Sequence, residues 1–147
     1  MTRIRLIVAA LFAALALSAC DMGPIFDPEK AEAERLAALP AKVAVDRIET
    51  LELGRLYDGY VLTAFGLAPG AGHYQPELRI RYEGRPAADG FYEYDFLVRP
   101  PADAAALAGA PESARRMRAD VTMPVAMLRG ARGVRVWSSR DSIEGRF

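Results

Sequence analysis

The sequence predicts an all-β domain, built as an antiparallel sandwich or a small barrel, that follows a short helix. Two segments in the middle of the chain alternate apolar and charged side chains with a period of two, which is typical of strands with one buried face. Glycine, proline and aspartate residues separate such segments at short intervals. About a hundred residues are involved, enough for one hydrophobic core.

The first residues have the parts of an export signal. Arg3 and Arg5 precede an apolar run, Leu6 to Leu17, that is shorter than the ~20 residues a membrane-spanning helix needs. The run ends in Leu17-Ser18-Ala19-Cys20, which resembles the lipobox of bacterial lipoproteins. Ordinary secretion is the alternative, because Ser18 and Ala19 also suit a general signal peptidase.

The lipobox resemblance implies cleavage between Ala19 and Cys20 and a diacylglycerol on the Cys20 thiol. Cys20 is the only cysteine of the chain, so it has no disulfide partner, and acylation explains its position best. Three acyl chains, as in the modification this resembles, would form a stable anchor. We therefore expect a periplasm-facing lipoprotein, on the inner membrane if Asp21 acts as a retention signal, with the outer membrane as the other location.

Cleavage would alter the net charge. The whole chain has 19 basic and 19 acidic residues. Loss of residues 1–19 removes Arg3 and Arg5 and no acid, which leaves a formal charge of −2. This balance favours neither a nucleic-acid partner nor adhesion to anionic lipid.

The segment behind Cys20 is predicted to be a tether. Asp27-Pro28-Glu29 supplies an N-cap residue, a first-turn proline and a first-turn acid, and Pro40 ends the helix at Leu39. The apolar stripe of this helix is thin, so a solvated spacer is favoured over a partner-binding helix. We divide the chain into a signal peptide (1–19), a lipidated tether with a short helix (20–41) and a β-domain (42–147).

The period changes to two after Lys42. Residues 60–67 are apolar on both faces, as in a central strand. Residues 77–83 and 92–99 are then predicted to form a hairpin. If the residue numbers of each cross-strand pair sum to 174, opposite charges meet on one face and apolar side chains meet on the other. This register sets Arg81 opposite Glu93 and Arg79 opposite Asp95, with Tyr82 against Tyr92 on the apolar face.

The remaining elements complete the sandwich. Pro100-Pro101 ends the hairpin, and residues 102–110 form a helical turn or a crossover to another sheet. Residues 116–123 alternate again, and Pro124 indicates an edge or a bulge. After a turn at 129–133, the last strand is expected at 134–137. About six or seven strands of this kind favour a sandwich of immunoglobulin-like outline.

The glycine, proline and aromatic punctuation of the domain resembles that of small bacterial lipoproteins. No activity is known for them, so the resemblance implies a location and no catalytic residues. It is carried by Leu67-Ala68-Pro69, Gly72-His73-Tyr74, Pro76-Glu77-Leu78, Pro86, Asp89-Gly90, Tyr94-Asp95-Phe96 and Pro100-Pro101.

Catalytic chemistry finds little support. His73 is the only histidine, so a zinc site or a Cys-His pair cannot be assembled, and we expect no metal and no cofactor. A triad would need Ser113, Ser138, Ser139 or Ser142 beside His73, without the Gly-x-Ser-x-Gly elbow. A loop histidine that packs or bonds to the backbone is favoured, and we assign no catalytic residue.

Two acids share one strand face, which would suit a carboxylate pair for hydrolysis or calcium binding. Glu93 and Asp95 have this spacing, but so does any alternating strand, and Arg79 and Arg81 are the expected neighbours. Ion pairing is therefore the favoured interpretation.

A candidate binding surface comes from aromatic residues that alternate outward or lie at strand ends, together with the loop histidine. Tyrosine and tryptophan are common at wet interfaces. The candidates are His73, Tyr74, Tyr57, Phe91 and Trp137. Arginines at 116, 118, 129, 132 and 135 form a further basic group, for which a solvated face is favoured over an acidic partner or lipid head groups.

Two function classes follow. The preferred one is a non-enzymatic binding or assembly module, anchored in the membrane, that contacts another envelope protein through a sheet edge or the His73 loop. The alternative is an envelope hydrolase that acts on a wall or glycan substrate with Glu77, Glu93 or Asp95.

Overall fold

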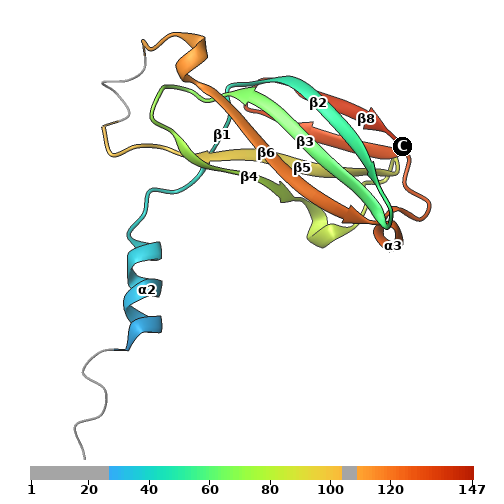
Figure 1. The fold of residues 1–147 in the computed structure, drawn as a ribbon, viewed down its shortest axis with the longest axis horizontal. Coiled ribbons are helices and arrows are strands. Elements are labelled where there is room, and N and C mark those ends of the chain that lie inside the picture. The colour runs from blue at the N-terminus through green and yellow to red at the C-terminus, as the bar shows by residue number, and fades with distance from the viewer. Residues whose placement is uncertain (1–26, 104–108) are drawn as a thin grey trace, which may run out of the picture. The chain divides into compact units, whose positions relative to one another are not determined.

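The computed structural model describes residues 27–103 and 109–147, and the chain divides into two units after Leu39 (Figure 1). The predicted signal peptide, its cleavage site and Cys20 lie outside the described residues. So does most of the segment 102–110, for which a helical turn or crossover is expected.

The first unit contains helix α2 (Pro28–Ala37). Asp27 caps it as predicted, because its carboxylate accepts hydrogen bonds from the backbone N–H groups of Glu29 and Lys30 at 3.1 and 3.3 Å. No residue of α2 is buried. The helix therefore depends on its cap and first-turn charge and not on a packed apolar face.

The second unit, Pro40–Phe147, is an all-β sandwich of two sheets (Figure 1). The first sheet contains β1 (Val43–Ala44), β4 (Tyr74–Ile80), β5 (Phe91–Arg99), β7 (Gly133–Trp137) and β8 (Ser142–Arg146). The second contains β2 (Arg47–Leu56), β3 (Gly59–Leu67) and β6 (Arg116–Pro124) in the order β2-β3-β6. The two sheets stay separate, which decides between the sandwich and the small barrel.

Short helices in the described part of the chain connect these strands. They are η1 (Tyr82–Gly84), η3 (Glu112–Ala114) and α3 (Val125–Leu128). The α3 segment is joined to the first sheet because the Tyr92 hydroxyl donates to the Met127 carbonyl.

Strand β5 organises the first sheet. It pairs with β4 on one edge, while β1 and β7 share its other edge end to end. The β5–β7 pair is parallel, whereas the other described strand pairs are antiparallel, as the sequence predicts. After β5 the chain crosses to the second sheet and runs back along the sandwich as β6. It then re-enters the first sheet as β7, which therefore runs in the same direction as β5.

The prediction that 134–137 is the last strand was wrong. Strand β8 follows and pairs with β7 antiparallel, Val136 opposite Ile143. Glycine permits this close pairing, since a Cβ on Gly133 would lie 2.1 Å from the Gly145 carbonyl oxygen. Small and polar residues weaken the apolar signal of β8, so no alternation marks it in the sequence.

The core lies between the two sheets. Strand β3 is the central strand of the second sheet, as its two apolar faces predict, and Leu62, Ala64 and Leu67 are buried. From the first sheet, β5 contributes Tyr94 and Phe96. The buried core residues that the structure describes all belong to Pro40–Phe147. This unit therefore contains its own core, as a domain able to fold alone does.

The hairpin register is confirmed for most of its length. Leu78 pairs with Phe96, Arg79 with Asp95 and Ile80 with Tyr94, as pairs summing to 174 require. The Arg81 N–H also donates to the Glu93 carbonyl at 2.8 Å, at the predicted next pair. The pairing then stops, because Tyr82 has a positive φ and enters η1. Its side chain is 58 % exposed, so the predicted contact with Tyr92 was wrong.

Strand β6 confirms its predicted alternation. Ala119 and Met123 are buried, Met117 and Val121 pack against the core, and the residues between them point outward. It is an edge strand of the second sheet, as Pro124 indicates. The segment 100–115 does carry the chain to the other sheet.

The sandwich has two ends, which we name here. At the entry end the chain arrives at Pro40, whose carbonyl accepts a hydrogen bond from Arg99 at the end of β5. At the far end lie the β2–β3 turn, α3, the loop between β4 and β5, and Phe147 (Figure 1).

Candidate functional site

The structure does not bring the predicted binding residues together. Tyr57 is fully exposed on the β2–β3 turn at the far end. His73 and Tyr74 follow the other end of β3, at the entry end. The nine residues of β3 separate the two groups, a distance on the order of 25 Å.

His73 has the role that the sequence favours. Its Nδ1 donates a hydrogen bond to the Gly70 carbonyl oxygen at 2.8 Å, which closes the loop before β4. Two of the serines that a triad would require bond elsewhere. The Ser139 hydroxyl donates to the Asp46 carbonyl and the Ser138 hydroxyl donates to the Asp141 carbonyl, both at 3.1 Å. Tyr74 remains partly exposed beside this loop.

The densest polar arrangement lies on the outer face of the first sheet. We call it the Glu93 cluster. Alternate residues of β5 and β7 form most of it, and single residues just after β4, just before β5 and on β8 complete it. Its members are Arg81, Asp89, Phe91, Glu93, Asp95, Arg135, Trp137 and Glu144.

Glu93 is the centre of this cluster and is only 4 % exposed. Its carboxylate accepts from Arg135 Nη1 at 2.7 Å, from the Trp137 indole N–H at 2.9 Å and from Arg81 Nη1 at 3.4 Å. A buried carboxylate is costly unless it is paired and hydrogen-bonded. These three donors meet that requirement.

The two arginines are in turn held by further carboxylates. Arg135 donates through Nη2 to Asp89 at 2.7 Å and through Nε to Glu144 at 2.9 Å. Arg81 donates through Nε to Asp95 at 2.9 Å. The guanidinium groups are therefore fixed in place, with most donors used.

The charges shift one another's protonation in the expected directions. Hydrogen bonds to Asp89 and then Glu144 raise the pKa of Arg135, and the bond to Asp95 raises the pKa of Arg81. The bond from Arg135 lowers the pKa of Asp89. Arg81, Arg135 and Asp89 are thus charged and paired at neutral pH.

Phe91 and Trp137 lie on the outer face, as their alternation predicts, but they do not form an open aromatic surface. Phe91 is 5 % exposed, and the Arg135 guanidinium lies 4.9 Å from its ring centroid. The Arg81 guanidinium lies 5.0 Å from the Trp137 ring centroid. The contact with Arg135 covers Phe91, so the expectation that Phe91 is available for binding was wrong. Trp137 is half-buried.

The carboxylates of the hydrolase alternative are engaged by basic residues. Glu77 pairs with Lys42 and Arg79, and these hydrogen bonds, the one from Lys42 above all, lower its pKa. Asp95 and Glu93 are held by arginines. A general acid needs the opposite environment, a desolvated carboxyl whose pKa is raised. The ion-paired interpretation of Glu93 and Asp95 is confirmed, with Arg81 as a partner of both. Arg79, the other expected partner, pairs with Glu77 instead.

Metal ligands do not gather in the part of the chain that the structure describes. No group of three or more histidine, cysteine, aspartate or glutamate side chains there could hold an ion. Within the same residues, no helix has the length and apolar character needed to cross a bilayer.

Sequence reasoning missed Arg135 as a partner of Glu93. The alternation with Val134 and Val136 does place Arg135 and Trp137 on an outer face. However, the parallel ladder that sets Arg135 opposite Glu93 joins strands 42 residues apart. Nothing local in the sequence indicates that neighbour.

The other exposed arginines of β6 have local partners. Arg116 pairs with Glu49 at 3.4 Å and Arg118 with Asp120 at 3.0 Å. Asp120 also accepts from the Thr63 hydroxyl, and this bond, more than that to Arg118, lowers its pKa. This face of the second sheet is a solvated, ion-paired face.

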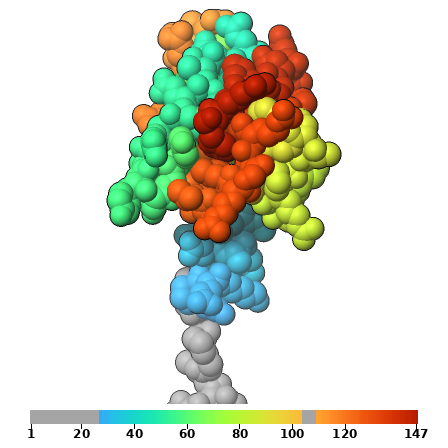
Figure 2. Space-filling model, turned by 90° about the vertical axis from the view of Figure 1, so that its right-hand side faces the viewer, coloured from blue at the N-terminus to red at the C-terminus, as the bar shows by residue number. Residues whose placement is uncertain are grey.

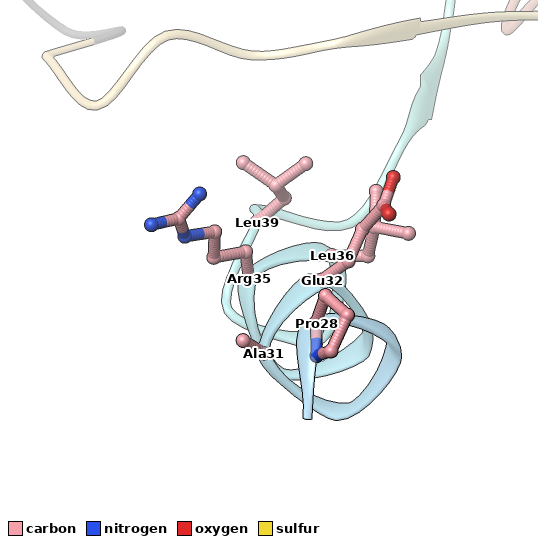
Figure 3. A pocket seen from close by; sticks show the side chains of 6 residues that line it. All are labelled: Pro28, Ala31, Glu32, Arg35, Leu36 and Leu39. Atoms are coloured by element: carbon pink, nitrogen blue, oxygen red, sulfur yellow. The ribbon is translucent and has the colours of Figure 1, made fainter. Parts of the chain in front are cut away.

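The first unit has a shallow hollow along one side of α2 (Figure 3). It is lined by Pro28, Ala31, Glu32, Arg35, Leu36 and Leu39. The six side chains come from one helix and the residues just behind it. The hollow is open and contains one acid and one base, without the convergent polar groups of a ligand pocket.

Comparison with known protein families, curated proteins and solved structures finds no match to this chain.

Proposed function

We propose that the chain is a membrane-anchored bacterial lipoprotein whose sandwich serves as a non-enzymatic binding or assembly module of the cell envelope. One observation carries the proposal: the only cysteine directly follows Leu17-Ser18-Ala19 at the end of an Arg-flanked apolar run. A diacylglycerol on Cys20 is the modification that fits this arrangement.

The geometry of the second unit supports the non-enzymatic part. Glu77, Glu93 and Asp95 are each paired with arginine or lysine. The Nδ1 atom of His73 donates a hydrogen bond to a backbone carbonyl oxygen. No observation favours the alternative, a wall or glycan hydrolase.

The proposed contact with a second envelope protein uses a sheet edge or the His73 loop. Edge strand β4 is poorly suited to strand addition, because it contains Pro76 and a register shift between Tyr74 and Glu77. Among the described edge strands β2 is the longest, with ten residues, and its Ile48 N–H donates to the Asp141 carboxylate near one end. Main-chain pairing along such an edge is a common mode of protein recognition.

In-cell photo-crosslinking tests this proposal. A photoreactive residue is introduced at Tyr74 in the loop or at Glu52 on β2, in the native lipoprotein, with Thr122 on the outer face of β6 as a control site. We expect one envelope protein to crosslink from Tyr74 or Glu52 and not from Thr122. Cys20→Ala should abolish membrane fractionation and the crosslink. Crosslinks from none of the sites at native abundance would refute the assembly function.

A further inference from the structure

Exposed apolar side chains concentrate at the far end of the sandwich. Two other exposed apolar residues of this unit, Val43 and Tyr74, lie at the entry end. Those at the far end are Leu56, Tyr57, Tyr82, Val125 and Phe147. A group of exposed apolar side chains indicates an interaction surface, whereas single exposed apolar side chains scattered over a protein do not.

Hydrogen bonds and ring contacts join the segments that carry these residues. The Val125 N–H of α3 donates to the Asp58 carbonyl oxygen of the β2–β3 turn at 2.9 Å. The Arg132 N–H, before β7, donates to the Gly90 carbonyl oxygen of the β4–β5 loop at 2.8 Å. The Phe147 ring centroid lies 5.2 Å from that of Tyr60. Figure 2 looks onto this end: the green β2–β3 turn, orange α3 segment, yellow β4–β5 loop and dark red C-terminus form one surface.

Arginines without an ion pair gather at the same end. Most arginines of the sandwich have a carboxylate partner, and Arg99 bonds to Gln75 and Pro40 at the entry end. Within the described residues, those that make no ion pair and lie at the far end are Arg55, Arg85, Arg129, Arg132 and Arg146. All of them are exposed.

Acids do not balance these bases locally. Asp58 and Glu83 are the acids of this end that make no ion pair among the described residues. Asp89 and Glu144 are held by Arg135 of the Glu93 cluster. Free guanidinium groups therefore outnumber free carboxylates at the far end, although the chain as a whole carries no net charge.

We infer that the far end docks on the surface of a phospholipid bilayer that carries anionic head groups. Guanidinium groups bind phosphate oxygens in a bidentate manner. Tyrosine, phenylalanine and aliphatic residues between them suit the interfacial region, where apolar groups are buried and polar tips stay hydrated. Tyr57 projects fully from its turn, a shape that enters a soft bilayer more readily than it fits a flat protein surface.

This inference does not depend on residues 1–39 and is independent of acylation at Cys20. The sandwich contains its own core, so residues 40–147 can be tested without the anchor. Failure of vesicle binding would leave the lipoprotein proposal intact, and an unacylated Cys20 would leave this one intact.

The test measures cosedimentation of residues 40–147 with vesicles of phosphatidylglycerol mixed with phosphatidylcholine. We expect binding that weakens as salt rises and is absent on phosphatidylcholine alone. Arg55→Gln with Arg129→Gln should weaken binding by about fivefold for each arginine. The matched control is Arg116→Gln with Arg118→Gln, which removes the same charge from exposed β6 positions and should bind like the native domain.

A second readout reports which end touches the lipid. Residues 40–147 contain no cysteine, so Tyr57→Cys or Thr122→Cys carries a single environment-sensitive fluorophore. We expect a blue shift on anionic vesicles at position 57 and none at 122. Equal loss of binding in both arginine variants, equal shifts at both sites, or no binding by the folded native domain would overturn the inference. Binding to an acidic protein but not to vesicles would do so as well.

Discussion

Arg135 lies directly opposite Glu93 in the parallel ladder between β5 and β7, and its Nη1 donates to the buried carboxylate at 2.7 Å. The hydrogen bond from Trp137 to the same carboxylate joins the same two strands. Arg81 also donates a hydrogen bond to the Glu93 carboxylate. These donors satisfy the buried acid on the outer face of the sheet.

Removing Arg135 should destabilise the sandwich strongly. Arg135→Met leaves Glu93 buried without its closest cation, and breaking a buried pair in this way costs about 3 kcal/mol. Chemical denaturation of residues 40–147 measures the loss. The double variant with Glu93→Gln should recover part of it, since the buried charge is then gone. A single variant as stable as the native domain would show that Glu93 does not rely on Arg135.

Acid should weaken the fold through Glu77. Its hydrogen bonds with Lys42 and then Arg79 lower its pKa in the folded state below the ordinary value of 4.5. A lowered folded-state pKa stabilises the fold above pH 4.5, and this contribution disappears as the pH falls through the folded-state pKa. The free energy of unfolding should therefore drop below about pH 4.5.

Urea denaturation across this acid range checks the prediction. Glu77→Gln should flatten part of the drop, whereas Glu52→Gln, an exposed change on β2, should leave the profile as it is. The same slope in the native chain and in Glu77→Gln would contradict the assigned role of Glu77.

Alkali should weaken the fold through Tyr94. Burial raises the pKa of Tyr94 from 10.0 to about 12. A raised folded-state pKa stabilises the fold fully below pH 10 and less as the pH rises through 12. The loss is on the order of 2 kcal/mol. Stability measured across this range should fall in the native domain and fall less in Tyr94→Phe, while Tyr57→Phe on the exposed turn should behave as the native protein does.

Gly133→Ala should disrupt the pairing of β7 with β8. The new Cβ would lie 2.1 Å from the Gly145 carbonyl oxygen, a backbone atom that cannot swing aside. Crowding of this kind costs about 1–3 kcal/mol. Gly109→Ala is the control, because a Cβ there meets nothing within 4 Å. Equal melting temperatures for the two variants would contradict the close approach of the strands.

The sequence allowed prediction wherever one strand face is buried and the other solvated. In β6, Met117 to Met123 alternate without a break, and in the β4–β5 hairpin the apolar face and the charges favour one register, which Leu78 and Phe96 adopt. The capping carboxylate of Asp27 predicted the helix start in the same local way.

What could not be predicted depends on neighbours distant in sequence. The parallel contact of β5 with β7 follows from the path of the chain through the second sheet, and local alternation is silent on it. Tyr82 fits the strand pattern but takes a positive φ in η1. The far-end arginines are dispersed along the sequence from Arg55 to Arg146, so only the fold assembles them.

The most direct test of the central claim is the mass of the amino-terminal peptide of the native protein isolated from membranes. We expect a peptide that begins at Cys20 and carries a diacylglyceryl thioether on its sulfur. A peptide that begins elsewhere, or an unmodified Cys20 in the membrane-bound protein, would contradict the lipid anchor and with it the proposed function.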